Sequence, residues 1–365
     1  MSDSTQVLSA NLIPRFRLQG RMESRLHADL VRMDVEADED GLDCAELVFL
    51  NWDRRTEDSE PGYVWFDGQA LELGRELEIV SGEEGAETVI FAGPITSLEG
   101  LFPELRPPEI RVRAESPLVW LRMNARSRLF ESQDDAGMAR TVLQAAGMNA
   151  DVQAAGADRA QSMQIEASDL RFLREKAIAA DARIEHGDGR VRLVPRRGGE
   201  SGPPLRLTRE DALLRFEAAA DLAHQRAEVH VNGWDVAAKA AIEGTAEGSV
   251  LAAENEGGGR TGPDFLSEIA PGAVEHLHLD GPLTESEART VAESRLKRRA
   301  RRFVTGRGIT SGNPELRPGG KVDLVDLGPW FSGVWHVTRV RHTFDRAEGF
   351  RTRFEAERVD RGASR

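Results

Sequence analysis

Two pairs of histidines are the residues best suited to bind a metal ion. His276 and His278 alternate with leucines, so a strand would point both imidazoles to the same side. Such a pair could supply half of a metal site. No cysteine and no His–carboxylate motif accompanies it, so a solvated strand face is the better interpretation, and the same holds for His336 and His342. The sequence therefore predicts neither a metal site nor a bound cofactor.

Acidic and nucleophilic residues form no catalytic pattern. Asp and Glu occur in surface alternation or in turns, and no isolated acidic pair lies within an apolar run, where burial would raise the pKa of a general acid. The sequence contains no Gly-x-Ser-x-Gly motif of a serine hydrolase. The single cysteine, Cys44, cannot form an internal disulfide, and its apolar neighbours indicate a core strand. These patterns argue against an enzyme.

A basic cluster is the most informative charged feature. Thr284 and Glu287 form a capping box, which predicts a helix over 285–302. Six cations crowd its last turns, where they complement the helix dipole: Arg295, Lys297, Arg298, Arg299, Arg301 and Arg302. A solvated face, nucleic-acid binding and contact with an acidic protein surface are the alternatives. The net charge of -14 disfavours phosphate binding, so we expect the protein contact, with Trp234 and Trp335 as candidate interface anchors.

Three segments would position these residues. Residues 1–124 are predicted to be β-rich, because apolar and charged residues alternate in runs separated by Gly, Pro and acidic turns. Residues 125–204 predict an α/β unit, with helices capped by Asp134 or Asp135 and by Ser168, a hairpin, and a Gly/Ser/Pro-rich linker at 198–204.

The third segment, residues 205–365, is predicted to be a second β region that also contains the basic helix. Its Gly-rich stretch 244–262 lacks the Gly-Lys-Ser/Thr of a phosphate loop and is expected to be a mobile surface loop. No run of the 365 residues approaches the roughly 20 apolar residues of a membrane span, and the N-terminus lacks a secretion-signal pattern. We therefore expect a cytoplasmic product.

The end of the chain repeats a pattern found near its beginning. Residues 71–80 and 316–325 share a leucine, a following glycine and an alternating apolar ending, and Phe-x-Gly triplets follow at 91–93 and 331–333. A turn glycine, a strand of period two and a glycine at a close backbone approach are what two copies of one small β-domain would share. The sequence therefore predicts two related β-domains.

Five stretches also carry a family resemblance through their order and spacing. They are Ser168–Ala177, Val231–Asp235, Gly306–Gly319, Phe331–Val337 and Gly349–Phe354. Together they resemble the phage late-control D family, clearly over residues 130–358 and by pattern only over 14–125. That family includes the baseplate hub proteins of contractile phage tails and the hub portions of type VI secretion and extracellular injection spikes.

The resemblance implies a mainly β fold with an α/β insertion and two related small β-barrels of the tail-tube type. It also implies a homotrimer, in which six barrels per ring adapt a six-fold tail tube to a three-fold spike. Because the sequence ends at Arg365, directly after the second predicted barrel, we expect the spike to be a separate protein. The tail tube protein and other baseplate proteins are further expected partners, without direct nucleic-acid or membrane binding.

The expected function is thus that of a structural hub, assembled in the bacterial cytoplasm as part of a virion tail or of an extracellular or injection particle. A tail-associated cell-wall hydrolase is the alternative, and it would require an acid–base pair inside a cleft.

Overall fold

The computed structural model describes residues 13–54, 60–83, 85–154, 158–197, 202–209, 211–235, 238–282 and 284–362. The chain divides into two compact units. Unit 1 comprises Met1–Val119, Ile309–Pro318 and Arg339–Phe354, and unit 2 comprises Trp120–Gly308, Gly319–Thr338 and Glu355–Arg365.

Alternating side chains produce the strands of the N-terminal part. In β3 (Leu30–Asp38) and β4 (Cys44–Leu50), apolar residues such as Val35 and Leu47 are fully buried, while the charged residues between them are more exposed. The first strand set contains β1 (Arg15–Leu18), β3 (Leu30–Asp38), β4 (Cys44–Leu50), β5 (Glu76–Ser81), β6 (Thr88–Leu101) and β7 (Glu109–Glu115). Strand β2 (Arg21–Met22) and helix α2 (Ser24–Asp29) connect β1 to β3. The core of unit 1 lies on this sheet, where the rings of Phe16 and Phe49 meet edge to face at 5.3 Å.

A second strand set comes from the C-terminal part of the chain. It contains β13 (Leu205–Thr208), β14 (Leu213–Ala220), β19 (Val304–Ser311), β20 (Lys321–Val325), β21 (Gly333–Asp345) and β22 (Gly349–Arg358). Helix α8 (Gly328–Phe331) precedes β21.

The two strand sets have the same spatial order. The first runs β3-β4-β7-β6-β5-β1 and the second β14-β19-β22-β21-β20-β13. When the strands of each set are ranked by their order along the chain, both sets have the same spatial order: second, third, sixth, fifth, fourth, first. They differ at one end, where β1 runs antiparallel to β5 while β13 runs parallel to β20. Pairing of β21 with β3 joins both sets into one 13-stranded sheet. The predicted mainly β class is confirmed, and the strands form a large, mostly antiparallel sheet. The pairing among the described strands does not confirm the two predicted barrels.

The sequence repeat is confirmed in its first half and wrong in its second. Gly74 donates its backbone N–H to the Ile95 carbonyl, and Gly319 donates to that of Val337, both at 2.8 Å. Ile95 in the first repeat is therefore equivalent to Val337 in the second. Two positions earlier, Gly93 is equivalent to Trp335 and not to Gly333. The Phe-x-Gly triplets do not correspond, because the second triplet begins at the end of α8, before its strand.

The α/β unit between the strand sets contains the two helices and the hairpin that the sequence predicts, together with three strands that it did not predict. Helix α4 (Asp135–Ala145) begins after Asp134, whose carboxylate accepts from the Gly137 N–H, and α5 (Asp169–Ala179) begins after Ser168, which caps the Arg171 N–H. Strands β11 (Ala182–Gly187), β12 (Arg190–Pro195) and β9 (Asn149–Val152) form a three-stranded sheet, and β8 (Ala125–Asp134) pairs with β10 (Asp158–Ser168). The short helix α3 (Val119–Arg122) precedes β8. Most of the linker predicted at 198–204 lies outside the described residues.

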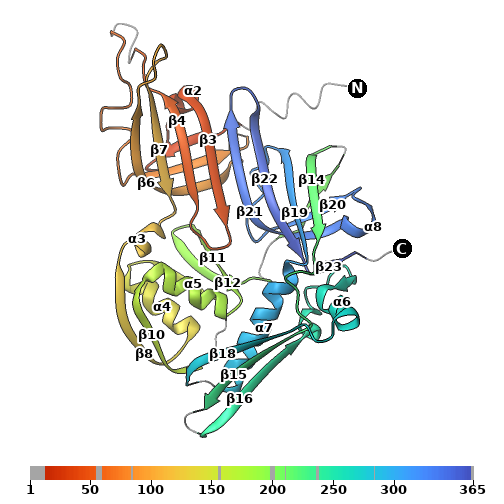
Figure 1. Ribbon diagram of the computed structural model, residues 1–365. Coiled ribbons are helices and arrows are strands. Elements are labelled where there is room, and N and C mark those ends of the chain that lie inside the picture. Colours follow the sequence, from red (N-terminus) through yellow and green to blue (C-terminus); the bar gives the residue numbers. More distant parts are fainter. Residues whose placement is uncertain are drawn as a thin grey trace. The chain divides into compact units, whose positions relative to one another are not determined.

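An α/β insertion separates β14 from β19. It contains β15 (Glu228–Asp235), β16 (Ala240–Glu247), the 3-10 helix η1 (Gly248–Leu251), β17 (Arg260–Thr261), α6 (Gly262–Ile269), β18 (Val274–Pro282) and α7 (Glu285–Arg301). Helix α7 lies along the sheet β16-β15-β18 (Figure 1) and buries Ala288, Ala292 and Leu296 against it. Strand β17 pairs with β23 (Asp360–Arg361) near the C-terminus. None of the helices in the described ranges combines the length and hydropathy needed to span a membrane.

The prediction of a mobile loop over 244–262 is wrong, because its glycines serve close packing. A Cβ on Gly244 would lie 2.3 Å from the carbonyl carbon of Ala288 in α7, and one on Gly259 would lie 2.1 Å from the Arg361 carbonyl oxygen. These glycines let β16 approach α7 and let the chain approach β23. The stretch therefore contributes a strand, a 3-10 helix and the start of α6.

Candidate protein interface

The basic end of α7 was the main candidate for an interface. The predicted capping box is present, since the Thr284 hydroxyl accepts from the Glu287 N–H and the Glu287 carboxylate accepts from the Thr284 N–H. The buried alanine face of α7 then fixes which way the cations of its last turns point. The structure shows that these cations have three different environments.

Two of the cations bind one carboxylate within the same unit. Arg295 Nη2 lies 2.9 Å from Glu275 Oε1, and Arg299 Nε lies 2.5 Å from Glu275 Oε2. Hydrogen bonds from Arg299, and then from Arg295, lower the pKa of Glu275 from 4.5 to about 2 against the opposing effect of burial. Glu275 lies on β18, so this ion cluster ties the end of α7 to the edge of its own sheet.

A third cation, Arg301, is buried inside unit 2. Its guanidinium binds Asp181 after α5 and Glu254 after η1, at 2.5 to 2.8 Å. Burial opposes the charge, yet the hydrogen bonds that Arg301 donates to Glu254 and Asp181 leave its pKa raised. Since this side chain is 1% exposed, it cannot meet a partner, and its assignment to an interface is corrected.

The remaining three cations keep contact with solvent. Arg302 is exposed, and Lys297 and Arg298 are half-buried. The net positive charge of the cluster is therefore smaller than the sequence indicated, because Glu275, Asp181 and Glu254 bind three of its six cations within the chain.

The two candidate tryptophans also differ. Trp234 on β15 is 51% exposed and stays available to a partner. Trp335 on β21 is 1% exposed, packs edge to face on Phe216 at 5.2 Å and lies beneath the Arg358 guanidinium. It is a core residue of unit 2, so its assignment as an interface anchor is corrected as well.

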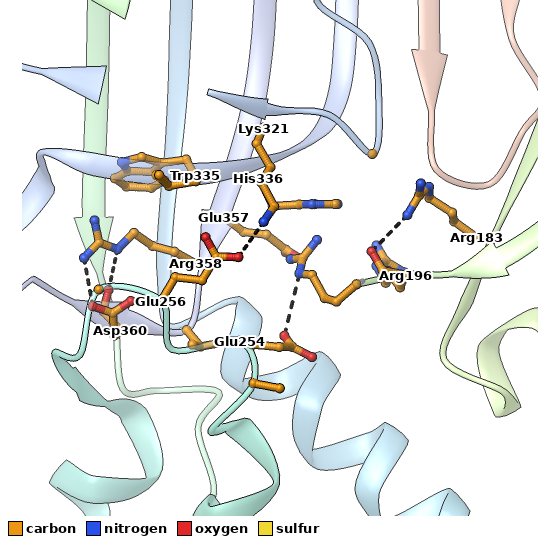
Figure 2. A pocket seen from close by; sticks show the side chains of 16 residues that line it. Arg183, Arg196, Glu254, Glu256, Lys321, Trp335, His336, Glu357, Arg358 and Asp360 are labelled. Atoms are coloured by element: carbon orange, nitrogen blue, oxygen red, sulfur yellow. Dashed lines mark hydrogen bonds and ion pairs between the residues drawn. The ribbon is translucent and has the colours of Figure 1, made fainter. Parts of the chain in front are cut away.

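A charged cavity of about 130 Å³ lies beside Trp335 and His336 (Figure 2). Each carboxylate that lines it is within 3.6 Å of a cation, and the pairs are Arg197–Glu254, Arg197–Glu357, Lys321–Glu256 and Arg358–Asp360. Ion pairing of this kind suits a structural network that connects β12, η1 and β22.

The four histidines of the two candidate pairs were predicted to lie on solvated strand faces, and this is right for one pair only. His276 and His278 are exposed on β18, as expected for a solvated face. His336 and His342 are buried, so the same interpretation is wrong for them. Burial, with a contribution from Arg197, holds the pKa of His336 well below 6.5, and burial lowers the pKa of His342 to about 4. Within the described part of the chain, no group of three or more His, Cys, Asp or Glu could hold a metal ion.

The sequence analysis missed an aromatic cluster in unit 1. Four side chains contact one another with ring centroids 5.2 to 6.2 Å apart: Trp52, Tyr63, Phe66 and Phe102. They are 42% to 64% exposed. The only sequence signal was that the single tyrosine lies between Trp52 and Phe66; that Phe102 joins them follows only from the fold.

Comparison with known proteins identifies a family and a fold. The family model described as the Alg8 N-terminal domain matches residues 22–346. Comparison with curated proteins found no match.

Three solved structures resemble the chain along nearly its whole length. A tail protein from Neisseria meningitidis MC58 is 12% identical with a TM-score of 0.68, covering 95% of this chain and 96% of that one. The prophage MuSo2 43 kDa tail protein from Shewanella oneidensis is 12% identical with a TM-score of 0.67, covering 95% and 98%. The E. coli c3393 protein is a type VI secretion component with structural similarity to the T4 tail proteins gp27 and gp5; it is 13% identical with a TM-score of 0.59, covering 95% and 79%. The chain therefore has the fold of these proteins.

Proposed function

The chain belongs to the Alg8 N-terminal domain family, and we propose that it is a structural hub subunit of a phage tail, a baseplate or a related contractile injection machine. Support comes from the fold that it shares with phage tail proteins and with a type VI secretion component. In this proposal the chain forms a homotrimeric ring that adapts a six-fold tail tube to a three-fold spike.

The observation that carries the proposal is the shared order of the two strand sets. A chain with two equivalent β modules presents six modules when it forms a closed three-fold ring, which matches both symmetries at once. We propose that each strand set curls into a small barrel, the first built mainly from residues 1–124 and the second from residues 205–365, with 125–204 between them.

The proposed partners are further copies of the chain, a separate spike protein, the tail tube protein and other baseplate proteins. Of the original interface candidates, Lys297, Arg298, Arg302 and Trp234 remain part of this proposal. Nucleic-acid binding is less favoured than the sequence indicated, since Arg295, Arg299 and Arg301 are engaged by carboxylates of the chain itself.

The proposed role is mechanical and involves no catalysis. A tail-associated hydrolase would require an acid–base pair in a cleft, and the carboxylates that line the charged cavity are instead matched with cations. The protein would be assembled in the bacterial cytoplasm and become part of a virion tail or an injection particle.

Light scattering on the purified chain tests this proposal. We expect a trimer of the 40.2 kDa chain at micromolar concentration, either alone or with the spike added. A monomer under both conditions would contradict the hub assignment. A peptidoglycan zymogram that the pure protein clears, and that one Asp or Glu substitution abolishes, would favour the hydrolase instead.

A further inference from the structure

The aromatic cluster of Trp52, Tyr63, Phe66 and Phe102 is the largest group of mutually contacting exposed rings in the described part of the chain. Exposed apolar patches of this kind mark interaction sites, and Trp and Tyr are enriched among the residues that dominate binding energy. Two of the four ring contacts are nearly perpendicular, 88° for Trp52–Tyr63 and 85° for Tyr63–Phe102, so the cluster is a ridged surface and not a flat platform. The other two contacts are tilted, at 30° for Tyr63–Phe66 and 55° for Phe66–Phe102. Such a ridge fits a pocket on another protein.

The described segments that carry three of these rings, residues 51–54 and 60–68, are fixed by hydrogen bonds. Asn51 is fully buried, and its side-chain oxygen accepts from the backbone N–H groups of Val64 at 3.0 Å and Trp65 at 2.7 Å. The buried Trp65 donates its indole N–H to Asp29 at 3.1 Å. Asp53 and Gly62 exchange backbone hydrogen bonds at 3.0 and 3.1 Å. Little ordering is therefore required on binding, which favours affinity.

Glycine at position 100 allows the fourth ring to join. A Cβ at Gly100 would lie 2.9 Å from the Phe102 ring and 3.0 Å from the Phe66 ring. Without that Cβ, both rings pack directly against strand β6. Their positions are thus set by the backbone before any partner arrives.

The segments that carry the cluster are acidic. Among residues 51–54, 60–68 and 99–109, six side chains are acidic and two are basic: Asp53, Glu60, Asp67, Glu99, Glu104 and Glu109 against Arg54 and Arg106. Asp53 pairs with Arg25 and Glu99 with Arg111, and the other four carboxylates still outnumber the two arginines. Because like charges oppose association, the same acidic segments of a second copy are poor occupants, whereas a partner with basic residues around its pocket is favoured.

The cluster is present on only one of the two strand sets. In the first set, β4 ends at Leu50 and β5 begins at Glu76, and the aromatic loop occupies this connection. In the second set, β19 ends at Ser311 and β20 begins at Lys321, so the equivalent connection is much shorter. The cluster therefore occurs once per chain and distinguishes two otherwise equivalent modules.

We propose that this aromatic cluster docks a different protein subunit, one that offers an apolar pocket rimmed by lysine or arginine. The proposal rests on the hub function above, because it takes the partner to be a neighbouring subunit of the same machine. To the hub function the proposal adds the docking surface, the basic character of the partner's pocket and a stoichiometry of one site per chain.

The test compares the parent with a Tyr63→Ala/Phe102→Ala variant. The probes are the purified tube protein and the purified spike protein encoded with this chain, each tested separately by calorimetry. We expect the variant to keep the circular dichroism spectrum and the oligomeric state of the parent and to bind one probe about tenfold or more weakly. Ile269→Ala removes a side chain from unit 2 that is as exposed as Phe102. It is the matched control and should bind as the parent does.

A second variant tests the charge argument without touching the rings. Glu60→Lys/Glu104→Lys should weaken binding of the same probe, and the difference from the parent should shrink as salt is added. If either variant loses the oligomeric state of the parent, the cluster contacts another copy of the chain and the proposal is wrong. It is equally wrong if the aromatic variant binds both probes as the parent does. Failure of the parent itself to form a trimer or to bind either probe would count against the hub function instead.

Discussion

Gly74 and Gly319 occupy equivalent positions in the two strand sets, each with a φ of +79° and each donating its N–H at 2.8 Å to the strand beside it. This is the left-handed region, which costs residues other than glycine roughly 1–2 kcal/mol. The same backbone turn therefore introduces β5 and β20, and glycine is required at both sites for the same reason.

Substituting these glycines should reveal how their surroundings differ. Gly74→Ala is expected to lower the free energy of unfolding by about 1 kcal/mol from backbone strain alone, since nothing lies within 4 Å of the added Cβ. Gly319→Ala should cost more, because its Cβ would lie 2.5 Å from Arg183 Nε. Chemical denaturation measures both. Gly272→Ala, which has neither positive φ nor near neighbours, should be close to neutral, and equal losses at positions 74 and 319 would contradict this account.

Replacing Glu275 with Gln should make the free energy of unfolding less dependent on pH. The folded-state pKa of about 2 lies below the ordinary value of 4.5, so the carboxylate adds stability above pH 4.5 that is lost as pH falls toward 2. We expect Glu275→Gln to cost on the order of 1–2 kcal/mol at pH 7, after allowance for solvent screening, and almost nothing near pH 2. Urea denaturation at several pH values measures the difference. Glu285→Gln, in an exposed pair with Arg289, is the control and should change little at any pH.

Protonation of the buried His342 should destabilise unit 1. Its folded-state pKa of about 4 lies below the ordinary 6.5, so unfolding takes up a proton and stability falls as pH drops from 6.5 to 4. His342 shares a hydrogen bond of 3.0 Å with the Thr352 hydroxyl, and glutamine can replace that contact without titrating. We therefore expect His342→Gln to show a smaller loss of unfolding free energy over this pH range. Parallel stability–pH curves for parent and variant would refute this prediction.

Loss of Arg301 should be among the most damaging single changes in unit 2. Arg301→Ala leaves Asp181 and the buried Glu254 without their shared guanidinium, and removal of one partner from a buried ion cluster typically costs about 3–5 kcal/mol. A triple variant, Arg301→Met/Asp181→Asn/Glu254→Gln, should recover much of this loss because no charge remains uncompensated. Arg302→Ala, one residue along and exposed, is the control for loss of a cation at the helix end. Thermal unfolding of the four proteins measures these effects, and a single variant as stable as the triple one would argue against the cluster.

The sequence by itself determined the features that arise within a few residues. The capping box at Thr284 and the N-caps at Ser168 and Asp134 could be predicted because each cap side chain bonds to a backbone N–H only three positions away. Most strands of the first set, though not β1, were predicted from the sequence, and the hairpin turn at Asp188-Gly189 was predicted from its residue types. The leucine–glycine half of the repeat belongs to this group as well.

Tertiary structure decided everything that depends on a partner distant in the chain. Arg301 finds Asp181, 120 positions away, so a surface charge in the sequence became a buried one in the fold. The Gly-rich stretch 244–262 became ordered because α7 and β23 press against its glycines, and spacing alone could not show those contacts. The second Phe-x-Gly triplet was misassigned for the same reason, since only the pairing of β21 with β20 sets its register. Local spacing predicts local hydrogen bonds, whereas burial depends on which distant segments the fold brings together, and that decided which cations, histidines and aromatic rings remain available to another molecule.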